Sequence, residues 1–195
     1  MYTVVGSVKT RAFRVVWLLE ELEQPYDHIA AAPRSAEILA HNPAGKVPAL
    51  IVDGSVLTDS VAIMTYLADR HGQFTYPAGT LDRARQDSFT NFVLDEFESL
   101  LWTATRHSFI LPQDRRLPEI KPTLHWEFSR STQTLLDRLG DNPFLMGAQM
   151  TVPDLVLAHC LSWASSAKFP QAAPRLADYL AQMQARPAYI RAMAR

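Results

Sequence analysis

Hydrophobic and polar residues along the first part of the chain predict strands that alternate with helices. Residues 2–5 are apolar and β-branched, which favours a short strand. The apolar positions of residues 11–24 recur at helical spacing until Pro25 ends the pattern. Residues 26–31 favour a second strand, and Ser35 is positioned to cap a short helix after it. The predicted order up to this point is strand, helix, strand, helix.

The next two apolar runs, ALIVD and SVLT, predict a β-hairpin. They meet at Asp53-Gly54, a dipeptide that suits a two-residue turn because both of its residues accept positive φ. Asp59 and Ser60 then precede an apolar helical pattern and can cap its start, while Gly72 can end it. The first domain is therefore predicted to have the order β-α-β-α-β-β-α.

Beyond residue 76 the spacing of apolar residues changes from strand-like alternation to helical periodicity, which predicts an all-helical second half. Residues 77–81 contain Pro, Gly and Thr and favour a linker. The fold class is thus α+β, with one domain at residues 1–76 and an all-helical domain at residues 82–195. Proline and glycine residues divide the second half into predicted helices at residues 81–111, 118–139, 153–167 and 175–186, followed by a turn after Pro187.

Composition narrows the possible partners. The chain has 195 residues, of which 48% are hydrophobic, and this allows one large core or two smaller cores. The formal net charge is −1 and like charges are not clustered, so nucleic acid is not an expected partner. Cys160 is the only cysteine, which favours a reducing, cytoplasmic location. No apolar segment has the length that a bilayer requires, so we do not expect a membrane partner. The histidines lack the spacing of a metal site, so we do not expect a metal.

Four motifs follow one another along this pattern: GS-xx-TR at residues 6–11, NPAGKVPAL at residues 42–50, DSxAI at residues 59–63 and TVPDL at residues 151–155. In this order, and on a β-α-β-α-β-β-α unit followed by helices, they resemble the cytosolic glutathione transferases, and in particular the serine-type, theta-like group. The resemblance covers essentially the whole chain. It implies a thioredoxin-like N-terminal domain, an all-helical C-terminal domain, a homodimer and a function in detoxification.

The resemblance also implies a site for glutathione, the tripeptide co-substrate of that family. The bond before Pro48 is expected to be cis, so that Val47 presents its N–H and C=O to the cysteinyl part of the ligand. Ser60 is expected to hold the γ-glutamyl carboxylate, with Asp59 near the ligand's ammonium group and Lys46 near its glycyl carboxylate. Taken singly, each of these features has a structural alternative. Pro48 also fits a trans proline before an edge strand, Asp59 and Ser60 fit a helix cap, and Lys46 fits a solvated loop lysine.

Catalysis in this family requires the thiolate form of glutathione. A free cysteine thiol has a pKa of about 8.5, so the protein must stabilise the anion. Ser7 is the first candidate to donate a hydrogen bond to the sulfur, because it directly follows the first strand, and Thr10 is the second candidate. The start of the next helix adds a positive dipole, and Arg11 can contact the ligand or cap the helix. Without the resemblance, Ser7 equally fits a residue that caps this helix.

The second substrate is expected to be a small hydrophobic electrophile, bound beside aromatic and polar side chains of the helical half. The candidate residues are Phe13, Trp102, Arg106, His107 and Phe109. Their aromatic members also fit helix packing, because aromatic residues at helical spacing more often belong to a core. Outside the site, Thr151 and Asp154 have the spacing of a reciprocal helix cap, and Trp126 is expected to pack between helices.

Three functions fit the predicted fold. The first is transfer of glutathione to an electrophile, and the second is glutathione-dependent reduction of a peroxide or a disulfide at the same site. The third is a catalytically silent module for protein interaction, because fold alone does not determine function. Val47, Pro48, Asp59 and Ser60 favour an enzyme, since an interaction module has no physical need for residues that bracket a tripeptide.

Overall fold

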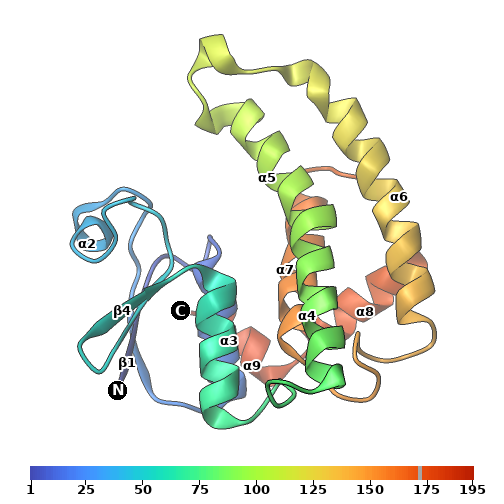
Figure 1. Ribbon diagram of the computed structural model, residues 1–195. Coiled ribbons are helices and arrows are strands. Elements are labelled where there is room, and N and C mark those ends of the chain that lie inside the picture. The colour runs from blue at the N-terminus through green and yellow to red at the C-terminus, as the bar shows by residue number, and fades with distance from the viewer. Residues whose placement is uncertain (171–172) are drawn as a thin grey trace. The chain divides into compact units, whose positions relative to one another are not determined.

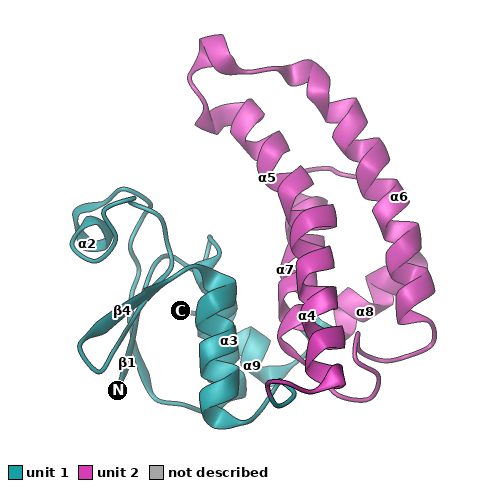
Figure 2. Cartoon of the chain, viewed as in Figure 1, with its two compact units in different colours: residues 1–77, 183–195 teal, residues 78–182 magenta. Residues whose placement is uncertain are grey.

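The computed structural model describes residues 1–170 and 173–195, which divide into two compact units (Figure 2). Unit 1 comprises residues 1–77 and 183–195, and unit 2 comprises residues 78–182. The sequence pattern assigns the whole segment 82–195 to the helical domain, whereas the structure groups its C-terminal end with the sheet unit. This difference arises because helical periodicity identifies a helix but does not determine which core the helix joins.

Unit 1 contains a four-stranded mixed sheet with the strand order β2-β1-β3-β4 (Figure 1). β2 runs parallel to β1, whereas β3 runs antiparallel to both β1 and β4. The predicted turn between β3 and β4 is confirmed, since Asp53 and Gly54 have φ values of 49° and 76°. The strands are β1 Tyr2–Val5, β2 Tyr26–Ile29, β3 Ala49–Val52 and β4 Ser55–Thr58.

The helices of unit 1 are α1 Ala12–Glu21, α2 Ala36–Leu39, α3 Ser60–His71 and α9 Pro187–Met193. Through Ile38, α2 covers the sheet face that carries Val5 and Ala49, while α1 and α3 pack against each other. The predicted cap of α2 by the side chain of Ser35 is wrong. This single-turn helix is instead closed by a backbone hydrogen bond of 3.0 Å from Leu39 N–H to Ser35 O.

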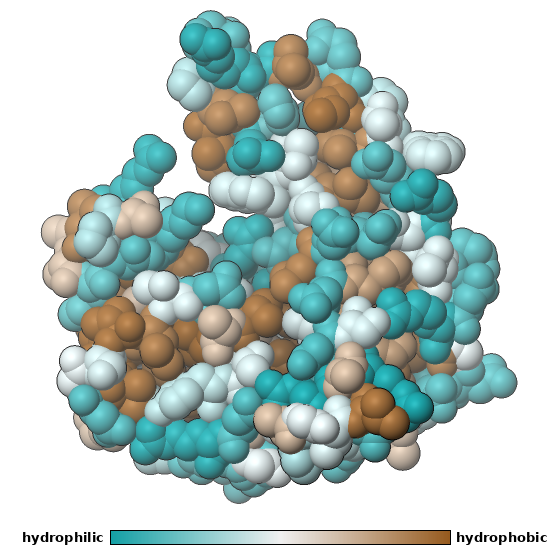
Figure 3. Space-filling model, viewed as in Figure 1, coloured by the Kyte–Doolittle hydropathy of each residue, from teal (hydrophilic) through white to brown (hydrophobic). Residues whose placement is uncertain are grey.

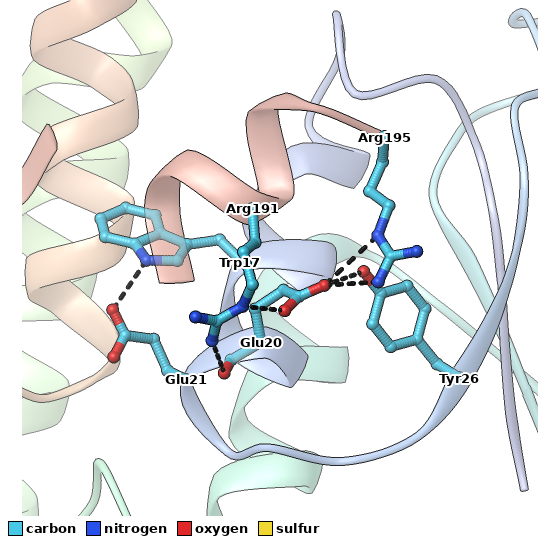
Figure 4. A network of polar contacts seen from close by, with 6 residues as sticks. All are labelled: Trp17, Glu20, Glu21, Tyr26, Arg191 and Arg195. Carbon is cyan, nitrogen blue, oxygen red and sulfur yellow. Dashed lines mark hydrogen bonds and ion pairs between the residues drawn. The ribbon is translucent and has the colours of Figure 1, made fainter. Parts of the chain in front are cut away.

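The C-terminal helix α9 is attached to the end of α1 by a network of charged side chains (Figure 4). The Glu20 carboxylate accepts hydrogen bonds from Arg191 Nε at 2.7 Å, Arg195 Nη2 at 2.8 Å and the Tyr26 hydroxyl at 2.7 Å. Burial alone would raise the pKa of Glu20, but these hydrogen bonds lower it to about 2. Glu20 therefore stays ionised and joins α1, β2 and α9.

Glu21 makes a second link between the same two helices. Its carboxylate accepts a bidentate pair from Arg186, with 2.6 Å to Nε and 2.8 Å to Nη2. The indole Nε1 of Trp17 donates to the same carboxylate at 2.9 Å. Bidentate pairing of a guanidinium with a carboxylate fixes the geometry as well as the distance, so α9 is held in one orientation on α1.

Unit 2 begins with a helical run at residues 81–110, which the sequence predicts as one helix. The run is α-helical at α4 Leu81–Val93 and α5 Ser99–Thr105 and π-helical at η1 Leu94–Glu98 and η2 Arg106–Ile110. A serine hydroxyl donates to a backbone carbonyl at both π-helical regions: Ser99, directly after η1, donates to Asp95, and Ser108, within η2, donates to Ala104. Apolar spacing does not reveal such one-residue expansions, because they are decided by local hydrogen bonding.

Two 3₁₀ turns, η3 Gln113–Arg115 and η4 Pro118–Ile120, lead into the remaining helices. In unit 2, α7 packs against α4, and α6 packs against α5. Cys160 is fully buried within α7, as expected for a small core residue. These helices are α6 Lys121–Leu139, α7 Val152–Ser166 and α8 Pro174–Gln184, the last of which crosses the boundary between the units.

The predicted reciprocal cap at the start of α7 is confirmed. The fully buried Asp154 carboxylate accepts hydrogen bonds from Thr151 N–H at 2.7 Å and from the Thr151 hydroxyl at 3.0 Å. It also accepts from Leu145 N–H and from the Tyr179 hydroxyl, each at 2.8 Å. Burial raises the pKa of Asp154 while these donors oppose the rise. Asp154 thus joins α7 to α8 and to the loop before α7.

Several large apolar side chains of unit 2 remain on its surface. Figure 3 shows hydrophobic groups at the end of the α5–α6 hairpin, where Phe109, Ile110 and Leu117 are exposed. The prediction that Trp126 packs between helices is wrong. Its side chain is 61% exposed, and the guanidinium of Arg130 lies 5.3 Å from its ring centroid. Trp126 is therefore largely exposed and makes a cation–π contact with a residue of its own helix, α6.

Candidate functional site

The strand register of unit 1 brings three predicted segments to one end of the sheet. Val5, the last residue of β1, pairs with Ala49, the first residue of β3. Ala49 also pairs with Thr58, the last residue of β4. The residues that follow β1, precede β3 and follow β4 therefore lie next to one another. These are the three segments in which the sequence predicts the glutathione-binding residues.

Gly6 brings the segment after β1 close to the segment before β3. Its φ is 144°, and a Cβ atom built on it would lie 2.8 Å from Cβ of Ala12 and 3.0 Å from Cβ of Val47. Contacts this short leave no room for a side chain, so the approach of the two segments requires glycine. Ser7 follows directly, and its N–H donates to Ala31 O at 2.8 Å. The backbone on both sides of Ser7 is thus held in place.

The hydroxyl groups of Ser7 and Thr10 differ in their hydrogen bonds. Thr10 Oγ1 donates to the Ser7 carbonyl at 2.6 Å and accepts from Ala12 N–H at 3.2 Å. Ser7 Oγ accepts from Lys9 N–H at 3.2 Å and donates to no other residue in the described ranges. Ser7 does not cap α1, because the N-cap position belongs to Arg11. The Ser7 hydroxyl proton therefore has no acceptor among the described residues, whereas Thr10 donates its proton within the turn before α1.

The peptide bond between Val47 and Pro48 is cis, as predicted. Val47 is half-buried, and within the described parts of the chain its N–H and C=O make no hydrogen bond. Lys46 is exposed, and its carbonyl accepts from Asn42 Nδ2 at 2.9 Å, which fixes the loop before Val47. One backbone donor and one acceptor are thus available to an extended peptide ligand, as at the edge of a sheet.

Asp59 and Ser60 form the start of α3. Asp59, with a φ of 72°, is the N-cap residue, and its Oδ1 accepts from Val61 N–H at 2.9 Å and Ala62 N–H at 3.0 Å, as the predicted cap requires. Ser60 is 3% exposed, and neither its N–H nor its hydroxyl donates to another residue that the structure describes. Two donors at the positive end of a helix dipole suit a carboxylate ligand.

Arg14 is a member of this site that the sequence reasoning missed. It lies in the first turn of α1, is fully buried, and its Nη1 donates to Ser60 Oγ at 3.4 Å. This hydrogen bond places the first turn of α1 beside the first residue of α3. The available signal was a charged residue between Phe13 and Val15, in the apolar first part of the helix, since charged residues are seldom fully buried.

The residues predicted to contact the electrophile belong to both units. Phe13, in unit 1, is 3% exposed and packs edge-on against Tyr189 with 5.0 Å between ring centroids. Trp102 and Arg106 belong to α5 and η2 of unit 2. The Nδ1 atom of His107 accepts a hydrogen bond of 3.1 Å from a backbone N–H, which fixes the orientation of its ring.

Unit 2 contains a cavity of about 590 Å³ that none of the predicted site residues lines. Among its lining residues, Arg138 lies over the rings of Phe89 and Phe92, and burial lowers the pKa of its guanidinium. The lining residues are Ser88, Asn91, Phe92, Leu94, Asp95, Glu96 and Arg138.

Two further features concern the whole described chain. Within residues 1–170 and 173–195, no three side chains of His, Cys, Asp or Glu lie together in a way that could hold a metal ion. In these same ranges, no helix has both the length and the apolar composition needed to cross a membrane.

The fold and the site define a thioredoxin-like unit, with a cis-proline loop and a helix N-terminus at one sheet end, followed by a helical unit. Residues 10–70 match the family model described as glutathione S-transferase, N-terminal domain. Glutathione S-transferase GstA of Escherichia coli O157:H7 is 30% identical over 157 residues, or 77% of this chain and 74% of the relative. The chain belongs to the glutathione S-transferase family.

Solved structures of this family have the same fold. A glutathione transferase from Methylococcus capsulatus str. Bath superposes with a TM-score of 0.86 and 28% identity, over 100% of this chain and 98% of that one. A sphingomonad glutathione S-transferase complexed with glutathione gives a TM-score of 0.84 and 25% identity, over 98% of this chain and 97% of that one. The similarity therefore extends through both units.

Proposed function

We propose that this glutathione transferase binds glutathione at the end of the unit 1 sheet and ionises its thiol beside Ser7. The thiol proton leaves to solvent, and the sulfur lone pair then forms a C–S bond to an alkyl or aryl carbon of a small hydrophobic electrophile. The bond from that carbon to its leaving group breaks, and the leaving group departs with the electron pair. The observation that carries this proposal is the Ser7 hydroxyl, whose proton has no acceptor among the described residues. Thr10, the alternative donor, already gives its proton to a backbone carbonyl at 2.6 Å.

The ligand would lie across the three segments that meet at the sheet end. Val47 would bind the cysteinyl part through its free N–H and C=O, as an added strand does. Ser60 would donate to the γ-glutamyl carboxylate, with Asp59 near the ammonium group of the same residue. Lys46 would reach the glycyl carboxylate, and Arg11 would add positive charge at the start of α1.

The energy needed to ionise the thiol is within reach of these groups. A hydrogen bond to a charged acceptor contributes about 1.5–3 kcal/mol, and a helix dipole contributes about 0.3–1 kcal/mol. Since each pKa unit corresponds to about 1.4 kcal/mol, the two together lower the thiol pKa by about one to three units. From a starting value of about 8.5, this is enough to make thiolate a major form at neutral pH.

In unit 2, the electrophile would bind beside Trp102, Arg106 and His107. The exposed Phe109 at the end of the α5–α6 hairpin adds apolar surface to unit 2. A peroxide or a disulfide would meet the same thiolate, so glutathione-dependent reduction uses the same donor with a different acceptor. A cytoplasmic location and a homodimer stay predictions, and light scattering of the purified protein tests the second.

The proposal is tested by the ultraviolet absorbance of the thiolate of bound glutathione, measured against pH. We expect the Ser7→Ala variant to raise the thiol pKa by about one to two units, because one charge-assisted hydrogen bond is lost. Thr10→Ala should have a smaller effect. Ser55→Ala is the matched control, because Ser55 is an exposed serine at the opposite end of the same sheet.

Each outcome of this titration has a distinct meaning. An unchanged thiol pKa in Ser7→Ala would remove Ser7 from the mechanism, while a full shift in Thr10→Ala would transfer the role to Thr10. If glutathione neither raises the melting temperature nor binds in calorimetry, the result favours an interaction module with a transferase fold, and the proposal fails.

A further inference from the structure

The position of Arg14 carries two energetic costs. Its side chain is fully buried, and removing a guanidinium from water is unfavourable. It also lies in the first turn of α1, where the positive end of the helix dipole disfavours a cation. Neighbouring positions on α1 are occupied by apolar residues, which would fill the same space without either cost. A buried cation in this place therefore needs a reason beyond packing.

The contact with Ser60 suggests what that reason is. Arg14 Nη1 donates to Ser60 Oγ at 3.4 Å, so the serine oxygen faces the guanidinium with a lone pair. A hydroxyl that accepts from one side directs its own proton to another side. Because this proton meets no acceptor in the described chain, it is available at the start of α3, beside the free N–H of the same residue.

We propose that Arg14 is a positioning residue for carboxylate recognition: it orients the Ser60 hydroxyl as a donor to the γ-glutamyl carboxylate of glutathione. The inference rests on the proposed function, since it assumes that glutathione binds with this carboxylate at Ser60. The first turns of α1 and α3 meet through this contact, so two helix dipoles and one guanidinium act on the same anion. Arg14 itself does not touch the ligand.

A purely structural role for Arg14 makes a different prediction. If the residue only linked two helices, its loss would weaken the binding of every ligand of the site to the same extent. A residue that orients the carboxylate donor affects only ligands that carry the carboxylate. The two roles are therefore separated by a pair of ligands that differ in this group alone.

The experiment compares glutathione with γ-aminobutyryl-cysteinylglycine, which is the same tripeptide without the γ-glutamyl carboxylate. Calorimetry gives the dissociation constant of each ligand, and their ratio measures recognition of the carboxylate. We expect Arg14→Met to reduce this ratio about three- to tenfold, as loss of one modest hydrogen bond would, and Arg14→Lys to retain more of it. Arg85→Met, at an exposed arginine of α4, is the control for the loss of one positive charge.

Thermal unfolding establishes that each variant is folded before its ligands are compared. Arg14→Gln keeps a polar side chain in the buried position and provides the same comparison if Arg14→Met does not fold. A ratio equal to that of wild type in either folded variant overturns the role of Arg14 alone. If wild type binds both ligands equally, Ser60 does not bind the γ-glutamyl carboxylate. If wild type binds neither ligand, the proposed function is refuted. Each of these two results overturns this inference as well.

Discussion

The attachment of α9 to α1 through Glu20 predicts a pH-dependent stability. Hydrogen bonds from Arg191, Tyr26 and Arg195 outweigh the effect of burial and hold the pKa of Glu20 at about 2, against an ordinary value of 4.5. At about 1.4 kcal/mol for each pKa unit, this difference corresponds to about 3 kcal/mol of stability at neutral pH. Arg191 and Arg195 have side chains that are 49% exposed, so solvent screening reduces the expected contribution to about 1–2 kcal/mol.

The direction in which stability changes with pH follows from the direction of the pKa difference between the folded and unfolded states. Glu20 has a lower pKa in the folded protein than in the unfolded chain, so the folded state is favoured when Glu20 is ionised. This contribution is complete above a pH of 4.5 and is lost as the pH falls from 4.5 towards 2. Replacing Glu20 with glutamine removes the charge at every pH and so should remove this part of the pH dependence.

Hydrogen exchange of the α9 backbone measures the effect where it arises. At pH 7 we expect Glu20→Gln to lower the free energy of local opening of α9 by about 1–2 kcal/mol, and at pH 3 we expect a smaller difference from wild type. Glu119→Gln, at an exposed carboxylate of unit 2, is the matched control and should leave α9 unchanged. Equal protection of α9 in wild type and Glu20→Gln at pH 7, or a difference that does not shrink at pH 3, would show that ionised Glu20 does not stabilise α9.

Two further substitutions test other parts of the fold. Asp154→Ala leaves four buried donors without their acceptor, so it should lower the free energy of unfolding by about 3–5 kcal/mol in urea titrations. A loss below about 1 kcal/mol would contradict the importance of this hydrogen-bond network. Gly6→Ala forces the new methyl group against Val47, so it should weaken glutathione binding and lower the melting temperature. Gly79→Ala is the control: Gly79 has a φ of 82° and nothing lies within 4 Å of the added Cβ, so this substitution carries only the backbone cost. Equal effects of the two glycine substitutions would show that the close contact does not matter.

Much of the sheet unit could be predicted from the sequence because its signals are local. The Asp53-Gly54 turn depends on two residues that accept positive φ. The start of α3 depends on the Asp59 carboxylate, which accepts from backbone N–H groups only two and three residues further along the chain. The cis bond before Pro48 was expected from a motif of a few consecutive residues and is present. In each case the residues that decide the geometry are neighbours in the chain.

Features that depend on distant residues could not be predicted in this way. Arg14 and Ser60 are 46 positions apart, and only the packing of α1 beside α3 brings them together. Trp126 lies on a helix face that periodicity assigns to a core, yet it remains 61% exposed. Periodicity defines the apolar face of a helix, whereas the partner of that face depends on the rest of the fold.

By itself the sequence determined the order of strands and helices, the family and the segments that carry the candidate site, because propensities, caps and turns act over a few residues. The tertiary structure alone decided that α9 joins the sheet unit, that Thr10 gives its proton to the backbone, and that Ser7 and Ser60 keep theirs. The physical reason is that a hydroxyl or a carboxylate is defined chemically by the atoms around it, and folding brings those atoms from distant parts of the chain.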